Sequence, residues 1–223
     1  MNILIADINI ETMKTRTILT ALFIFSVVAA FSQGKDAKAS ALLEEVSKKA
    51  KSHKSIKVEF SYTMENTKAK INEEKTGTLL VSGDKYKMSA AGQNVICDGK
   101  TIWTYLKESN EVQVNALENK DDALTPSKLL TSYNSNYKSR IIKSTDPSTE
   151  SVELIPNTGK NFTKAILGID KEKKQVKSFT LYDKSGNTFT YKIKTYLTDT
   201  PVTDADFTFD PKKFPGVEVI DMR

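Results

Sequence analysis

The chain has 223 residues, of which 39% are hydrophobic and 27% charged, with only 9 glycines and 6 prolines. This composition excludes a disordered chain and leaves enough apolar residues for a sizeable core. The net charge of +5 is compatible with attraction to anionic lipid or nucleic acid, but the lysines are scattered as on an ordinary soluble surface. Arginine, the side chain best suited to bidentate contacts with bases and phosphates, occurs only at Arg16, Arg140 and Arg223, which argues against nucleic acid binding.

A secretion signal is the clearest local feature. Lys14 and Arg16 form a positive n-region, an apolar run spans residues 18–28, and Ala30 and Ser32 supply the small residues that a signal peptidase reads. We therefore interpret residues 1–32 as a signal peptide that starts at Met13 and is cleaved near Ser32-Gln33, with residues 33–223 forming a single exported domain. The alternative is an uncleaved N-terminal anchor, for which the apolar run is short.

An amphipathic helix is predicted next. Asp36 can cap its N-terminus, and apolar residues recur at helical spacing while charged residues occupy the opposite side. The apolar positions are Ala39, Leu42, Leu43, Val46 and Ala50. Docking against a sheet is favoured for this stripe over a position on a membrane surface.

Strands and turns account for most of the remaining chain. Residues 56–65 alternate between apolar and polar side chains, which predicts a strand with one buried face. Further strands are predicted in GTLLVSGDKYKMSA, QNVICDGKTIWTYL, KESNEVQVN, YKSRIIK, SVELIPN, TKAILGID, QVKSFTLYD and NTFTYKIKTYL, separated by turns such as Asp98-Gly99 and Ser185-Gly186-Asn187. Turn signals about every 8–12 residues are typical of a sandwich or barrel.

Two segments depart from the strand pattern. Thr125 followed by Pro126 predicts a helix start within the run from Asp121 to Asn136. The last piece, DADFTFDPKKFPG, is rich in aromatic residues and proline and receives no assigned element.

Few residues are suited to catalysis. His53 is the only histidine, and its place at the end of the first helix is typical of a surface residue. Cys97 is the only cysteine, so it forms no intramolecular disulfide, and we expect it to be buried in a strand. The acidic pairs Asp121-Asp122 and Glu73-Glu74 are predicted to be solvated in loops, although two carboxylates meeting in space could still cleave a glycoside. No metal, no cofactor and no enzymatic activity are expected, and a periplasmic hydrolase is the least favoured function.

Two adjacent segments carry a family resemblance. GTLLVSGDKYKMSA, residues 77–90, reads as strand, turn and strand, and NVICDGKTIWTYLKESNEV, residues 94–112, places Asp-Gly before an aromatic-rich strand. In these segments, and in the order of signal, helix, long first strand and hairpins, the chain resembles the LolA family of outer-membrane lipoprotein carrier proteins. The resemblance implies a mainly β (α+β) fold: an unclosed antiparallel β-barrel, or strongly curved sheet, with a few helices plugging its concave face.

The same resemblance implies a function. It is that of a monomeric periplasmic carrier that holds lipoprotein acyl chains, or another lipid, and shuttles them from an inner-membrane release complex to an outer-membrane acceptor. Each buried methylene is worth ~0.8 kcal/mol, so such chains require a dry cavity during transit. The alternative is an envelope lipid sensor or protein-binding scaffold of the same fold.

Fourteen alternating apolar residues are the candidates for the cavity wall. They are Phe60, Tyr62, Met64, Leu80, Tyr86, Met88, Ile96, Trp103, Tyr105, Phe179, Leu181, Phe189, Tyr191 and Ile193. Alternation alone does not distinguish a cavity from a packed core, which remains the alternative for these positions.

The sequence departs from the family at one turn. Well-studied carriers of the family that this chain resembles have an Arg-Pro pair just after the Gly-x-Leu strand. In those carriers the arginine helps to hold the lid of the cavity closed. Here that turn is Ser82-Gly83-Asp84, and the nearest cations are Lys85 and Lys87. Lysine does not reproduce the forked bonds of a guanidinium group.

Overall fold

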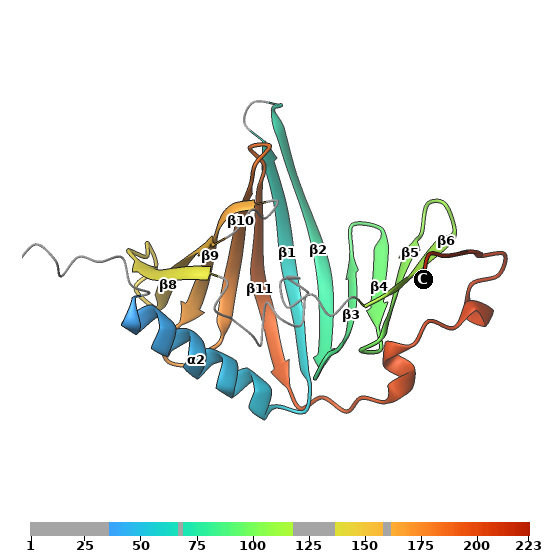
Figure 1. Cartoon of the computed structure of the whole chain (residues 1–223), viewed down its shortest axis with the longest axis horizontal. Coiled ribbons are helices and arrows are strands. Elements are labelled where there is room, and N and C mark those ends of the chain that lie inside the picture. The colour runs from blue at the N-terminus through green and yellow to red at the C-terminus, as the bar shows by residue number, and fades with distance from the viewer. Residues whose placement is uncertain (1–35, 67–68, 118–136, 158–161) are drawn as a thin grey trace, which may run out of the picture. The chain divides into compact units, whose positions relative to one another are not determined.

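The computed structural model describes residues 36–66, 69–117, 137–157 and 162–223. The predicted signal peptide and the helix expected from Thr125 lie outside these residues. One α-helix, two short 3-10 helices and twelve strands make up the described part of the chain (Figure 1). They are α2 (Ala37–Ser52), β1 (Ile56–Asn66), β2 (Ile71–Ser82), β3 (Lys85–Ala90), β4 (Gln93–Cys97), β5 (Thr101–Leu106), β6 (Glu111–Ala116), β7 (Tyr137–Ile142), β8 (Thr149–Pro156), β9 (Phe162–Asp170), β10 (Val176–Asp183), β11 (Thr188–Thr198), η2 (Asp204–Phe207), η3 (Pro211–Lys213) and β12 (Glu218–Asp221).

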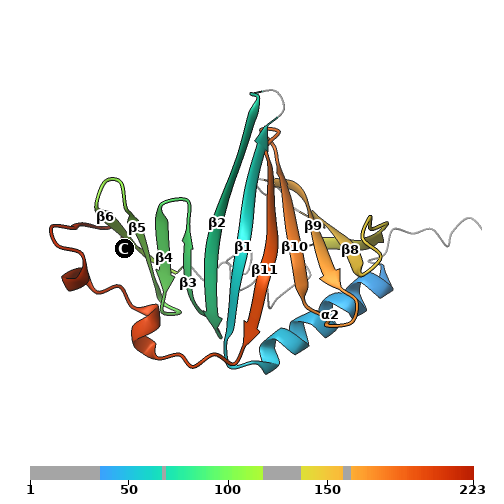
Figure 2. The ribbon, with the colours of Figure 1, turned by 180° about the vertical axis from the view of Figure 1, so that it is seen from behind.

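All twelve strands belong to one sheet, in the order β12-β6-β5-β4-β3-β2-β1-β11-β10-β9-β8-β7. Strands β1 to β6 follow one another as a meander, strands β7 to β11 form a second one, and β1 joins the two by pairing with β11 (Figures 1 and 2). Neighbours are antiparallel except β12, which pairs parallel to β6. The end strands β12 and β7 do not pair with each other, so the sheet stays open. The predicted unclosed antiparallel barrel is confirmed, and the sandwich is excluded.

Irregular pairing bends the sheet at its centre. Between β1 and β11 the register shifts after Glu59, which leaves Lys194 as an extra residue on β11. Such a bulge bends its strand and increases the local twist. Residues from β7 at one edge to β4 near the other all share one hydrophobic cluster with α2, so the sheet curls towards the helix. We call the side that carries Val58 and α2 the inner face, and the opposite side the outer face.

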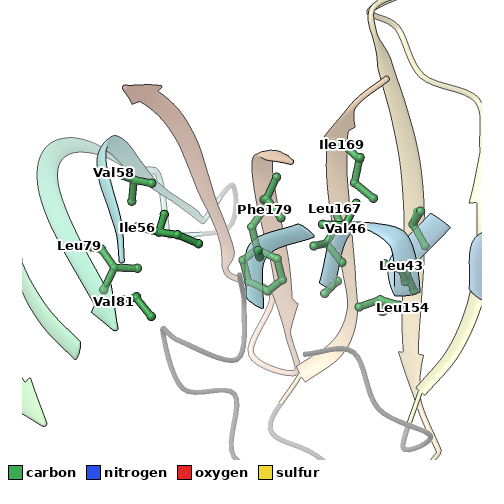
Figure 3. Close-up of a cluster of buried hydrophobic side chains, with 14 of the residues drawn as sticks. Leu43, Val46, Ile56, Val58, Leu79, Val81, Leu154, Leu167, Ile169 and Phe179 are labelled. Atoms are coloured by element: carbon green, nitrogen blue, oxygen red, sulfur yellow. The ribbon is translucent and has the colours of Figure 1, made fainter. Parts of the chain in front are cut away.

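The helix plugs one end of the inner face. Of the five apolar positions predicted to pack on the sheet, Ala39, Leu43, Val46 and Ala50 are buried, and Leu42 is half-buried. Figure 3 shows Leu43 and Val46 pointing at Leu154, Leu167 and Phe179 of the sheet. Burial of this kind contributes roughly 25 cal/mol per Å² of apolar surface removed from water, and it is the main force that holds the helix in place.

Polar contacts fasten both ends of α2. At the N-terminus, Asp36 accepts bonds from the amides of Lys38 and Ala39, and its second carboxylate oxygen accepts from the Ile141 amide of β7 at 3.0 Å. At the C-terminus, His53 Nδ1 lies 2.8 Å from Asp199 Oδ2 at the end of β11. The helix is therefore tied to two strands that lie four places apart in the sheet.

The C-terminal segment covers the outer face. After β11 it passes along η2 and η3 and packs Phe209 and Phe214 against Tyr105 of β5, with ring centroids 6.0 and 4.5 Å away. This second cluster also contains Ile96 and Val112. The apolar side chains on the outer face of β4 to β6 are thus covered by the C-terminal segment.

Three local expectations can be compared with the structure. Cys97 is buried, as predicted. His53 does cap the helix C-terminus, but its side chain is only 23% exposed because it pairs with Asp199. Glu73 and Glu74 are solvated as predicted but lie in β2 and not in a loop, since β2 begins at Ile71. Within the described residues, no helix has the length and apolar character needed to cross a membrane.

Candidate binding site on the inner face

Five aromatic rings gather on the inner face of β1, β10 and β11. Tyr191 of β11 lies at their centre, with ring centroids of Phe60 at 5.7 Å, Tyr62 at 5.0 Å and Phe179 at 6.2 Å. Phe189 stacks on Tyr62 at 6.2 Å. The register brings these rings together because Tyr62 of β1 and Phe179 of β10 both stand opposite Tyr191. We call these five residues the aromatic wall.

Burial falls along this face from the plugged end to the open end. Val58 and Leu167, near α2, are 2% and 0% exposed. Tyr62, Met64 and Leu181, towards the β1–β2 and β10–β11 turns, are only half-buried. The inner face is therefore a filled core at one end and an accessible apolar surface at the other.

A hollow opens at the accessible end. It has a volume of about 420 Å³ and is lined by Phe162, Leu181, Asp183, Lys184, Ser185 and Phe189. Its apolar lining comes from the starts of β9 and β11 and from the end of β10, and its polar lining from Asp183 at the end of β10 and from the β10–β11 turn. Ligand pockets of small molecules have volumes of this order, with mainly apolar walls and a few polar groups.

The site carries few charged groups. Burial raises the pKa of Tyr191 to about 12 and also raises the pKa of Tyr62, so both phenols are neutral at physiological pH. Desolvation opposes ionisation of Asp183, but hydrogen bonds from the side chain and backbone of Asn187 outweigh it and lower the pKa of this carboxyl. Among the described residues that line the hollow, the charged ones are Asp183 and Lys184.

Strand pairing divides the fourteen predicted wall residues between the two faces. Ten share the inner face: Phe60, Tyr62, Met64, Tyr86, Met88, Phe179, Leu181, Phe189, Tyr191 and Ile193. The other four, Leu80, Ile96, Trp103 and Tyr105, lie on the outer face, where Ile96, Trp103 and Tyr105 pack in the cluster beneath the C-terminal segment. Ten of the fourteen candidates therefore share one face of the sheet, and their role as the wall of a lipid cavity stays a prediction.

The alternation of residues did not predict which side chains of β4 and β5 lie on the inner face, because both faces of these strands carry apolar side chains. Val95 and Ile102 occupy the inner face beside Met88, while Ile96 and Trp103 occupy the outer face. The aromatic residues of DADFTFDPKKFPG were the available signal that another segment covers that outer face. Phe162, Asp183, Lys184 and Ser185 were also missed as lining residues, since they lie at strand ends where alternation gives no information.

The two lysines nearest the missing arginine lie far from the helix. Lys85 and Lys87 point from β3 to the outer face, because they pair in register with Ser82 and Leu80. Lys85 Nζ binds Asp204 Oδ1 of η2 at 2.6 Å. Both lysines therefore lie on the face opposite α2, and the ends of the helix are held by the contacts of Asp36 and His53.

Reactive groups are sparse in the described part of the chain. No group of three or more His, Cys, Asp or Glu side chains converges there as a metal site would require. The one histidine is engaged with Asp199 at the helix end. The arrangement of the inner face is suited to binding an apolar ligand.

The described chain thus combines an open, curved antiparallel sheet with a helix at one end of its inner face and an apolar hollow at the other. The model of the family described as "Outer membrane lipoprotein carrier protein LolA" matches residues 51–210. The chain belongs to the LolA family.

Relatives are distant at the level of sequence. An outer-membrane lipoprotein carrier protein from Coxiella burnetii is 24% identical over 134 residues, which cover 59% of this chain and 62% of that protein. An uncharacterized conserved protein from Thermus thermophilus has a similar structure, with a TM-score of 0.53 and 14% identity over 82% of this chain and 99% of that one. A LolA superfamily protein from Nitrosomonas europaea gives a TM-score of 0.44 at 11% identity, over 77% and 98% of the two chains. The structural similarity in the first of these two extends over nearly all of the Thermus protein.

Proposed function

We propose that this protein is a non-catalytic periplasmic carrier that binds acyl chains of lipoproteins, or of another lipid, and moves them from the inner to the outer membrane. Family membership and the name of the Coxiella relative support a carrier of this kind. Export follows from the signal interpreted in residues 1–32. An inner-membrane release complex would load the carrier, and an outer-membrane acceptor would unload it.

The observation that carries the proposal is the hollow beside the aromatic wall. It lies on the inner face, between Leu181 and Phe189, at the end that α2 leaves open. Phe162, Leu181 and Phe189 would offer an acyl chain an apolar surface there. Each methylene transferred from water gains ~0.8 kcal/mol, which is enough to hold a long chain without any specific polar contact.

Narrowing the hollow should weaken acyl binding. In Leu181→Trp a larger side chain projects into the space that the lipid would occupy, and we expect at least about a tenfold rise in the dissociation constant of a fluorescent fatty acid. Thr180→Trp is the matched control, because Thr180 precedes Leu181 on the same strand but faces the outer side, opposite Thr190.

The two variants separate a specific effect from general damage. Thermal unfolding of both should stay close to that of the wild type, since both positions are only half-buried. Loss of binding in Leu181→Trp alone supports the site. Equal binding by both variants and the wild type would exclude the hollow as the acyl site.

A further inference from the structure

The edge strand β12 exposes an unusual amount of apolar surface. Five large hydrophobic side chains are exposed in the described part of the chain, and three of them lie in or beside this short strand. Val219 is 53% exposed, Ile220 36% and Met222 50%. Isolated exposed apolar residues are normal on a protein surface, but a run of them on a sheet edge is not.

The backbone of β12 is ready to pair on its second side. The amides of Glu218 and Met222 donate to carbonyls of Asn110 and Val114, so these residues face β6. In a strand alternate residues direct their N–H and C=O groups to opposite sides, so the amides of Val219 and Asp221 point away from β6. No other described strand pairs with β12 on that side.

The side chains of β12 and their partners on β6 determine which segment would fit beside this strand. Glu218 stands directly opposite Glu111 of β6, and like charges at such a position are destabilising. A cation on a further strand would relieve that repulsion. Val219 and Ile220 occupy the next two positions of β12, and an incoming strand could cover them with apolar side chains of its own.

Pairing between two copies of this chain fits poorly. Two antiparallel β12 strands centred on Ile220 would set Glu218 against Met222 and Val219 against Asp221 of the other copy, so Glu218 would meet no cation and an apolar side chain would stand against a carboxylate. The opposite sheet edge does carry cations beside apolar residues, at residues 140–143. However, β7 is already capped there, since Asp36 accepts from the Ile141 amide and donates its own amide to the Ser139 carbonyl.

We propose that the free edge of β12 is a docking edge for an extended segment of a partner protein, in which a lysine or arginine adjoins two apolar residues. The segment would add a thirteenth strand to the sheet by main-chain hydrogen bonds, with side chains giving specificity. The cation would lie opposite Glu218, because Asp221 is already bonded to Arg223 at 2.6 Å. This edge is remote in the strand order from β10 and β11, so the proposal is independent of the acyl site.

The test uses a fluorescently labelled synthetic peptide with lysines on both sides of a Val-Ile pair, so that either strand direction sets a cation against Glu218. Binding to the full-length mature protein is followed by fluorescence anisotropy. We expect Glu218→Lys to weaken binding about threefold to fivefold and to improve binding of the peptide with glutamates in place of the lysines. Val219→Pro removes an outward-facing amide and spares the bonds to β6, and it should weaken binding about tenfold or more.

The outcomes decide the proposal. If Glu218→Lys and Val219→Pro both weaken binding of the lysine peptide and leave uptake of a fluorescent fatty acid unchanged, the result supports a docking edge separate from the acyl site. Equal affinity for the lysine and glutamate peptides, or for the wild type and Val219→Pro, would overturn it. A wild-type dimer in sedimentation that Val219→Pro abolishes would show that a second copy takes the edge, and would overturn the partner assigned here. Far-UV circular dichroism of each variant checks that the sheet is intact.

Discussion

Phe60 and Gly77 show how a single residue shapes the inner wall. They face each other across β1 and β2, and the Phe60 ring lies over the glycine. A Cβ atom at position 77 would come within 2.5 Å of Phe60 Cζ and 2.8 Å of the Ser89 carbonyl oxygen. Glycine is therefore what allows the Phe60 ring to lie over β2, where it meets the Tyr191 ring edge to face.

Gly77→Ala should destabilise the protein by about 1–3 kcal/mol, the usual cost of overpacking, because Phe60 has to move and the Ser89 backbone cannot. Urea unfolding measures the loss. The control is Thr78→Ala on the same strand, which is exposed and faces the outer side. Equal stability of Gly77→Ala and the wild type would show that the ring is free to shift.

Lys85→Ala and Lys87→Ala should leave lipid transfer almost unchanged. Both side chains are on the outer face, and an exposed ion pair such as Lys85–Asp204 contributes little to stability. Transfer of a fluorescent fatty acid from the protein to vesicles is the measurement. A large loss of transfer in either variant would mean that a lysine does replace the arginine missing from this turn.

At the residue scale, the sequence predicts which side chains are buried better than it predicts on which face of the sheet each one lies. Alternation in β1, β10 and β11 placed Tyr62, Leu181 and Tyr191 on one face, and pairing confirms it. It could not place Ile96 or Trp103, because in β4 and β5 consecutive residues are apolar and both faces are covered. Which face a strand turns to a cavity depends on its neighbours in the sheet, and single-strand periodicity carries no such information.

At the scale of elements, the helix was the most predictable part. Its cap, its length and its buried stripe all follow from Asp36 and the spacing of Ala39, Leu43, Val46 and Ala50. The parallel strand β12 was not predictable, because its four residues gain their partner only when the C-terminal segment crosses the outer face. That crossing is fixed by Tyr105, Phe209 and Phe214, which are far apart in the sequence.

Asp36 should make the attachment of α2 sensitive to acid. The Ile141 amide is the largest influence that lowers the pKa of this carboxyl below its ordinary value of 3.8. A lowered pKa means that the folded state favours the charged form, so its contribution is present above about pH 3.8 and is lost as the pH falls through the lower folded-state value. Protection of the Ile141 amide from hydrogen exchange should therefore fall in strong acid.

Asp36→Asn is the matched variant, because it keeps the shape of the side chain but has a single acceptor oxygen. Its Ile141 protection, measured by NMR, should be lower than that of the wild type at neutral pH and should no longer depend on acid through this group. The same acid dependence in both proteins would show that another carboxylate controls the helix.

At the scale of the whole molecule, the sheet separates two surfaces. The apolar hollow belongs to β9, β10 and β11, whereas the exposed edge is β12, beyond β6. The helix divides the inner face again, into a closed core and an open end. A carrier needs both a protected place for its cargo and a place to meet partners, and the two sites proposed here lie on strands that do not overlap.

The central claim is that the open end of the inner face carries acyl chains, and native mass spectrometry of the mature protein purified from its own periplasm tests it most directly. We expect a bound species that lipid extraction identifies as a lipoprotein or acyl lipid, and we expect it to be lost in Leu181→Trp and retained in Thr180→Trp. A ligand-free protein that also takes up no fluorescent fatty acid would contradict the account, and the fold would then have to serve another purpose.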